Sequence, residues 1–233
     1  MFHLHRLQQH QVTLQNTCNY DCLGCQHRDA SEKTVLPTAA KAGDILNIYG
    51  GGVQLSPELP RIIAQAKAKG VKPRLYGNHA LLQCDPTLLS DIAELVVWCP
   101  TPDPTQFNFL VGGQEYAEFK DTIMAPRIPK LTLAMGVRPL TLELLPEFYD
   151  LCVAAKAGGN VLYWPKEFTK EERRYIQRFK RVNGMRVIKQ RLASGPHCLA
   201  APNRLGTFGF ELGEWWWAMR QSLKRLPLVG PIL

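Results

Sequence analysis

Three cysteines near the start of the chain have the spacing of a metal-binding loop. Cys18, Cys22 and Cys25 lie in the segment CNYDCLGC, at a C-x3-C-x2-C spacing. A loop this short can place three thiolates on one metal centre, but it contains no fourth cysteine to complete a four-thiolate site. One coordination position is therefore left open. An open position is typical of a reactive metal site, whereas a structural site is normally closed.

Alternating strand and helix patterns follow this loop along the chain. They predict strands at residues 10–15, 44–49, 72–76, 94–98, 130–135 and 160–164, with possible further strands at 107–111 and 185–192. They predict helices that begin near Ser56, Pro86, Gln114, Pro146 and Thr169, with Gly158 and Gly159 closing the fourth of these.

About six strand and helix repeats with short connections require a parallel sheet, because such crossovers are right-handed. We therefore expect an α/β protein, a partial (β/α)6 barrel over residues 1–193, with a helical or irregular C-terminal tail over 194–233 that packs on the barrel or docks a partner. The cysteine loop follows the first strand, so it should lie at the carboxyl end of the barrel, where such folds place their chemistry.

With the cysteine loop in this position, the sequence resembles the radical S-adenosylmethionine (radical SAM) enzymes, over residues 12–168. In that family three cysteines hold a [4Fe–4S] cluster, and SAM chelates the fourth iron. The resemblance implies that Cys18, Cys22 and Cys25 are those ligands. It also implies that an electron from an external donor cleaves SAM at the cluster, and that the resulting 5′-deoxyadenosyl radical takes a hydrogen atom from the substrate.

A glycine triplet adds to the resemblance. Gly50, Gly51 and Gly52 resemble the family's Gly-Gly-Glu-Pro stretch after the second strand, whose backbone approaches the SAM amino group. Gly52 and Val53 stand where Glu and Pro are usual, so a carboxylate contact to SAM is lost or supplied elsewhere. A plain turn from strand to helix is the alternative interpretation of the triplet.

Two more residues are candidate SAM contacts by the same resemblance. Asn78, in the segment YGN, resembles the Asn of the family's Thr-Asn-Gly end of the third strand, near the SAM ribose, with the order of Asn and Gly exchanged. A turn-forming Asn is the alternative. Gly24 departs from the family, in which an aromatic residue often precedes the third cysteine and covers the adenine. Tyr20 is the candidate substitute.

A structural zinc site is the main alternative for the cysteine loop, with His27 or His79 as the fourth ligand. Two features argue against it: the loop opens a long series of strands and helices, not a small standalone finger, and glycine-rich loops follow later strands. We expect the iron–sulfur centre. A zinc-binding RNA or protein adaptor without catalysis is the alternative of another class.

Composition indicates an ordinary globular protein of a reducing compartment. The chain has 233 residues, 45% hydrophobic and 21% charged, with no apolar run that approaches a membrane span. Its seven cysteines are an odd number, which is unlike a secreted disulfide framework, and we expect a cytoplasmic protein. Cys84, Cys99 and Cys152 lie in apolar patterns and should be core residues. Cys198, beside His197, is either inert or a reactive thiol, and as a lone tail cysteine it predicts no auxiliary cluster.

The net charge of +8 is concentrated in residues 166–191, which hold ten basic and three acidic residues. This segment could bind RNA or an acidic peptide leader, or form the solvated face of a helix. Trp215, Trp216 and Trp217 precede a basic stretch that could lie on a membrane surface, dock a partner or plug the barrel.

These features favour a short radical SAM maturase that modifies a peptide or protein, including by backbone excision, with help from a leader-binding partner protein. A nucleoside or small-molecule enzyme and a glycyl-radical activase are the alternatives. No sequence pattern identifies the residue that donates or accepts the hydrogen atom.

Overall fold

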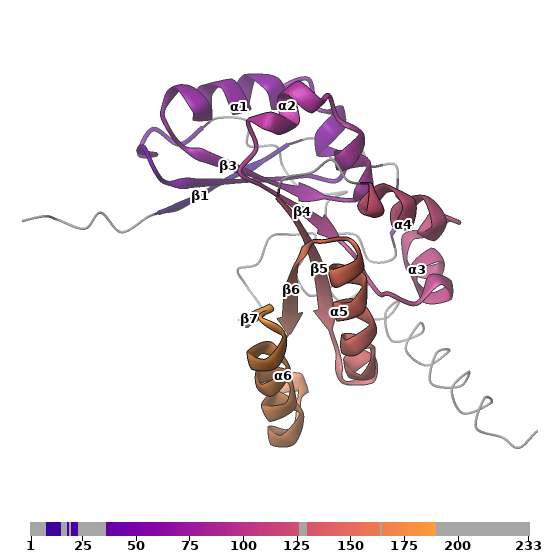
Figure 1. The fold of residues 1–233 in the computed structure, drawn as a ribbon. Helices are drawn as coiled ribbons and strands as arrows, with labels where there is room; N and C mark the ends of the chain where they lie inside the picture. Colours follow the sequence, from indigo (N-terminus) through magenta and orange to yellow (C-terminus); the bar gives the residue numbers. More distant parts are fainter. Residues whose placement is uncertain are drawn as a thin grey trace, which may run out of the picture.

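Seven parallel strands form the framework of the protein. The computed structural model describes residues 8–14, 18, 20–22, 36–125, 130–163 and 165–189. The strands are β1 (Gln9–Thr13), β2 (Ile45–Tyr49), β3 (Lys72–Gly77), β4 (Glu94–Trp98), β5 (Leu131–Val137), β6 (Gly158–Tyr163) and β7 (Arg186–Lys189). Each pairs with the next in the chain, and the sheet curls into an open half-barrel (Figure 1). The predicted α/β partial barrel with parallel strands is confirmed, and β7 corresponds to the further strand expected at 185–192.

Helices connect the strands and cover the outer side of the sheet (Figure 1). They are α1 (Leu59–Ala68), α2 (Pro86–Ser90), α3 (Pro104–Val111), α4 (Tyr116–Met124), α5 (Leu145–Ala154) and α6 (Lys170–Asn183). Short 3-10 turns are η2 (Val53–Leu55), η3 (His79–Gln83), η4 (Pro139–Leu144) and η5 (Pro165–Glu167). Among the described residues, no helix combines the length and the apolar character needed to cross a membrane.

Two local predictions are wrong. The segment 107–111 is not a strand, since it forms the second half of α3, whose start is fixed by Pro104 and by the Asp103 side chain accepting from the Gln106 amide at 2.8 Å. Gly158 and Gly159 do not close a helix but begin β6. A Cβ on Gly159 would meet the terminal methyl of Met185, which would have to move to make room for it. The predicted tail, residues 194–233, lies outside the described residues.

The two faces of the sheet differ in chemistry. The outward face carries apolar residues such as Ile48, Leu75 and Val97, which are fully buried and belong to one core with residues of the helices. The inward face carries a separate small apolar cluster of Val96, Ala134 and Leu162. Since side chains alternate along a strand, this pattern places every second residue inside the half-barrel.

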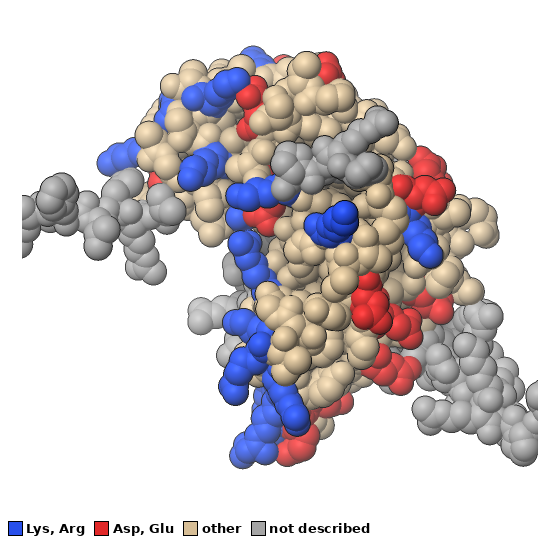
Figure 2. All heavy atoms as spheres, in the orientation of Figure 1, with Lys and Arg blue, Asp and Glu red and all other residues tan. Residues whose placement is uncertain are grey.

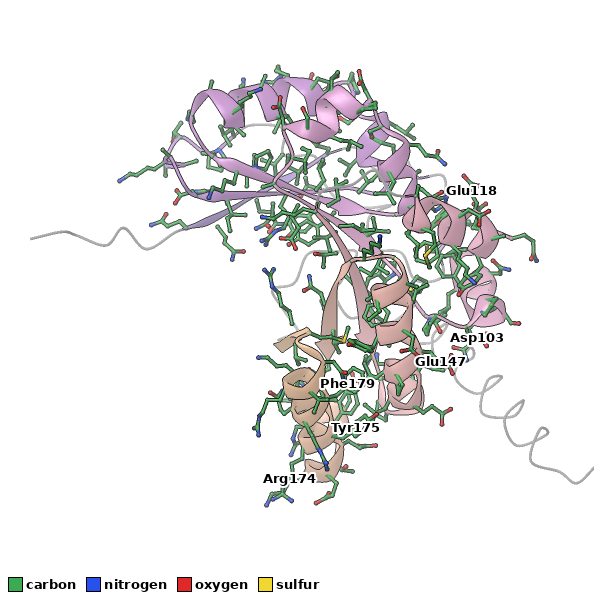
Figure 3. The ribbon with its side chains drawn as sticks, in the orientation of Figure 1. Asp103, Glu118, Glu147, Arg174, Tyr175 and Phe179 are labelled. Atoms are coloured by element: carbon green, nitrogen blue, oxygen red, sulfur yellow. The ribbon has the colours of Figure 1, made fainter. Side chains whose placement is uncertain are left out.

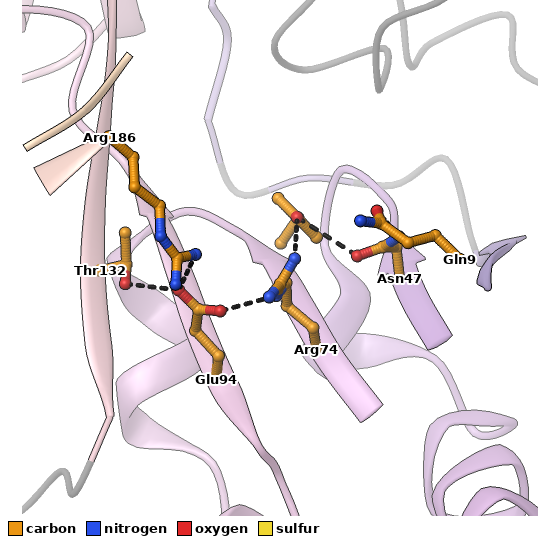
Figure 4. Close-up of polar contacts among 7 residues, drawn as sticks. Gln9, Asn47, Arg74, Glu94, Thr132 and Arg186 are labelled. Atoms are coloured by element: carbon orange, nitrogen blue, oxygen red, sulfur yellow. Dashed lines mark hydrogen bonds and ion pairs between the residues drawn. The ribbon is translucent and has the colours of Figure 1, made fainter. Parts of the chain in front are cut away.

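A polar network crosses the inward face near the amino ends of the strands (Figure 4). The Glu94 carboxylate pairs with Arg74 Nε at 2.7 Å, accepts a hydrogen bond from Thr132 at 2.7 Å and lies 3.6 Å from Arg186. The network continues through the Tyr76 hydroxyl to Asn47 and Gln9. Side chains of six strands are therefore tied together inside the half-barrel.

Candidate functional site

The cysteine loop, the glycine triplet and Asn78 meet at the carboxyl ends of β1, β2 and β3. The Cys18 thiol donates a hydrogen bond to the Gly51 carbonyl at 3.1 Å. Asn78 Nδ2 donates to Cys18 Sγ at 3.5 Å. These three residues follow adjacent parallel strands, whose carboxyl ends share one edge of the sheet. Sequence positions far apart are thus brought into contact.

The cysteine loop provides a polar environment for the Cys18 sulfur. The Tyr20 amide also donates to Cys18 Sγ, at 3.4 Å. A sulfur that accepts two N–H groups is suited to the thiolate form, which is the form that binds metal. The surroundings of Cys18 therefore fit a thiolate ligand of a metal ion. Cys25 and His27 lie outside the described residues.

The glycine triplet forms a buried turn between β2 and η2. Gly50, Gly51 and Gly52 are all buried, and Gly52 caps the 3-10 turn that begins at Val53. Val53 has no exposed surface and packs in the main core. This position consequently presents backbone groups and supplies no carboxylate.

Asn78 forms a turn and contacts Cys18 at the same time. Its Oδ1 accepts from the Ala80 amide at 3.0 Å and caps η3, while its Nδ2 reaches Cys18. The turn that the sequence offered as an alternative is thus present, and the SAM contact of Asn78 stays a prediction.

Tyr20 is buried within the loop. Its hydroxyl is hydrogen-bonded to Nδ1 of His79, and the two rings lie 5.5 Å apart between centroids. Burial, with smaller contributions from the nearby Glu115, Cys22 and other acidic groups, raises the pKa of Tyr20 far above its usual range. The hydroxyl therefore remains protonated.

His79 and Glu118 continue this contact toward the surface. His79 Nε2 lies 3.3 Å from Glu118 Oε1, and Gln83 donates to the same oxygen at 2.9 Å. Glu118 lies on α4, on the outer side of the half-barrel (Figure 3). The two ring nitrogens of His79 thus contact Tyr20 and Glu118, and among the described residues the potential metal ligands grouped with His79 are Glu115 and Glu118, not cysteines. Sequence reasoning missed Glu118, because only the fold brings α4 beside η3.

A second anchor holds the loop against α3. The Asp21 amide donates to the Val111 carbonyl at 3.1 Å. The next residue, Gly112, has φ +76°, and a Cβ there would lie 2.8 Å from the Asp21 carbonyl oxygen. Glycine thus permits both the left-handed helix end and the close approach of the loop.

Two other cysteines are core residues, as predicted. Cys99 and Cys152 are buried. Burial raises the pKa of the Cys152 thiol to about 12 and that of Cys99 well above its usual value. These thiols remain protonated and are not candidate metal ligands. Cys84 was also expected in the core, but it is partly exposed at the end of η3. Cys198 lies outside the described residues.

The comparisons with known proteins rest on structure. The sequence matches no family model and no curated protein. The structure is similar to SuiB of Streptococcus suis bound to the precursor peptide SuiA, with a TM-score of 0.57 and 13% identity over 80% of this chain and 49% of SuiB. SuiB bound to S-adenosylmethionine gives a TM-score of 0.54 and 12% identity, covering 80% of this chain and 48% of SuiB. The chain thus spans about half the length of SuiB, and the part that matches shares its fold.

Proposed function

We propose that this protein is a radical SAM enzyme that removes a hydrogen atom from a peptide or protein substrate. The observation that carries the proposal is the contact of Cys18 with Gly51 and Asn78. A C-x3-C-x2-C loop alone is compatible with several metals. The meeting of its first cysteine with the two segments that resemble SAM-binding segments favours the radical SAM chemistry.

Each residue has a proposed part in this site. Cys18, Cys22 and Cys25 would hold a [4Fe–4S] cluster, while Gly50, Gly51, Gly52 and Asn78 would line the SAM site and Tyr20 would border it. When bound, the cluster and SAM supply reductive cleavage of SAM and the abstraction of a hydrogen atom. Deprotonation of Cys18 on metal binding would release the Gly51 carbonyl from the thiol that now donates to it at 3.1 Å, leaving an acceptor for the SAM amino group.

A peptide substrate is supported by two observations. The fold is that of SuiB, which has been solved with a precursor peptide. In addition, Lys and Arg side chains gather over α6 (Figure 2). Lys170, Arg174, Arg178 and Arg181 are all exposed and follow one another at three- or four-residue spacing, so they form one row, which we call the basic row.

The basic row is suited to an acidic segment of the substrate, such as a leader peptide. Within the part of the chain that the structure describes, none of its four cations has an ion-pair partner. Tyr175 and Val182 beside it are 41% and 74% exposed. Figure 3 shows Arg174 near the lower end of α6 and Tyr175 beside Phe179, with their ring centroids 6.1 Å apart. A leader-binding partner protein and an external electron donor would complete the system.

The proposal also covers the cellular location of the protein and the division of its chain into two parts. A cytoplasmic location would keep the three cluster cysteines reduced. Residues 1–193 would form the catalytic partial barrel, and residues 194–233 would pack on it or dock a partner.

The first experiment is anaerobic reconstitution of the full chain with iron and sulfide. We expect about four irons per chain, a broad absorbance at about 400 nm, and 5′-deoxyadenosine formation from SAM and a reductant. Cys22→Ala should abolish all three, whereas Cys84→Ala, the matched control outside the loop, should retain them. One zinc per chain with no SAM cleavage would contradict the proposal and favour the adaptor alternative.

A second experiment addresses the substrate class. SAM turnover by the reconstituted protein is compared in the presence of a mixed synthetic peptide pool, a mixture of nucleosides, and buffer. Stimulation by peptides is expected. Stimulation by nucleosides alone would replace the peptide assignment while leaving the radical chemistry intact.

A further inference from the structure

A continuous hydrogen-bond chain runs from the surface of α4 into the cysteine loop. It passes from Gln83 and Glu118 through His79 to the hydroxyl of Tyr20. Tyr20 lies between Cys18 and Cys22 in the sequence and is buried. The hydrogen-bond chain therefore reaches the loop at Tyr20, the middle of the three residues between the first two cysteines.

Each link in this chain is a contact between two polar atoms. The Tyr20 hydroxyl and His79 Nδ1 share a hydrogen bond. Hydrogen bonds from Gln83 and from His79 lower the pKa of Glu118, so its carboxylate accepts the proton on His79 Nε2.

His79 is also rigidly held. It is 1% exposed, and its ring lies edge-on against Phe119, with centroids 6.3 Å apart at 87°. The preceding residue, Asn78, donates to Cys18. One turn thus contacts the loop twice, through Asn78 to Cys18 and through His79 to Tyr20.

We propose that His79, oriented by Glu118, is a positioning residue that fixes the Cys18–Cys22 loop over the carboxyl ends of β1 to β3. This inference rests on the proposed cluster-binding role of the loop. The hydrogen bond to Tyr20 keeps the loop closed before the metal centre is assembled. In the loaded protein the same bond fixes the distance between the thiolates and the surrounding amides, which tunes the potential of an iron–sulfur centre.

The test begins with the protein free of metal. Alkylation of Cys18 and Cys22 by iodoacetamide is followed by mass spectrometry, with Cys84 as an internal reference. Tyr20→Phe removes only the hydroxyl and should raise the alkylation rate of both loop cysteines about fivefold, the factor expected for one hydrogen bond of ordinary net strength. His79→Phe should raise it similarly. The double variant should be no faster than either single variant, because all three break the same contact.

Tyr116→Phe is the matched control, since Tyr116 is a partly buried tyrosine of α4 near the same aromatic cluster. It should leave the alkylation rates unchanged. Unchanged rates in Tyr20→Phe, or fully additive effects of the two substitutions, would overturn the proposal. A thermal unfolding curve of each variant separates local loop opening from global unfolding.

The loaded protein supplies a second measurement. Where a cluster assembles, Tyr20→Phe and His79→Phe should shift its midpoint potential in the same direction, and Tyr116→Phe should not shift it. An unshifted potential in both variants would overturn the tuning role. Failure of the proposed function would be recognised separately, because a chain that binds no cluster still reports loop opening through alkylation.

Discussion

At the scale of single residues, Gly112 at the end of α3 is a point of close approach to the cysteine loop. We predict that Gly112→Ala destabilises the protein more than Gly184→Ala does. Both glycines have positive φ, +76° and +65°, so each alanine incurs roughly 1–2 kcal/mol of left-handed backbone strain. Only Gly112 has a neighbour at its missing Cβ, namely the backbone of Asp21. The clash should add about 1–3 kcal/mol.

The measurement is the free energy of unfolding of both variants from denaturant titrations. The Gly184→Ala control cancels the effect of alanine on the unfolded chain. An equal decrease in the free energy of unfolding of the two variants would show that the close approach of the loop to Gly112 does not affect stability.

Asp44 gives a pH-dependent prediction at the same scale. Its carboxylate accepts from the amides of Gln8 and Lys41 and lies 3.0 Å from His10 Nε2. These hydrogen bonds, led by that of Gln8, lower the pKa of Asp44 far below its ordinary value. A lowered pKa adds stability above the unfolded-state value of about 3.9, and this stability is lost as the pH falls further.

We therefore expect Asp44→Asn to have a lower melting temperature than the wild type at pH 7. The difference should shrink progressively as the pH is lowered below about 4. Thermal unfolding followed by circular dichroism over this range checks the result. A difference that is constant with pH would mean that the charge of Asp44 does not contribute.

Sequence reasoning succeeded at the residues whose chemistry is local and missed those that the fold brings together. Cys18, Gly51 and Asn78 could be predicted to meet, because each directly follows a strand and parallel strands share one carboxyl edge. The link from Tyr20 to His79 could not, since it joins residues 59 positions apart and depends on how η3 packs. Glu118 joins this hydrogen-bond chain only because α4 lies against the same turn.

At the scale of elements, the network on the inner face of the sheet is predicted to stabilise the half-barrel. Glu94 and Arg74 pair with only 12% and 17% of their side chains exposed. Glu94→Ala would leave the Arg74 cation buried without its partner, and should cost about 3 kcal/mol. Glu58→Ala, which breaks the exposed pair with Arg61, should cost less than about 1 kcal/mol. Urea titrations of both variants measure these costs, and similar values for the two would contradict the structural role of the network.

The same scale explains which elements the sequence predicted. Strands such as 94–98 were recognised because they are short apolar runs between turn residues, and α6 because Thr169 and Glu172 form a capping box, which the structure confirms. The segment 107–111 was mistaken for a strand because its aromatic and apolar residues are equally compatible with a buried helix. The capping Asp103 and the following Pro104 were the signals that favoured the helix.

At the scale of the whole molecule, the net charge of +8 is predicted to act through its position on α6. The full chain should bind a glutamate-rich synthetic peptide more tightly than the same peptide with Gln at every Glu, and added salt should weaken the binding. Reversing the basic row to glutamate (K170E, R174E, R178E, R181E) should weaken binding at least about tenfold. Reversing four exposed lysines elsewhere (K69E, K72E, K120E, K130E) changes the net charge equally and should have a much smaller effect.

Fluorescence anisotropy of the labelled peptide measures the binding of both variants. Equal losses in the two variants would mean that overall charge governs binding, and tighter binding of a polyuridine competitor through the basic row would instead assign this face to RNA.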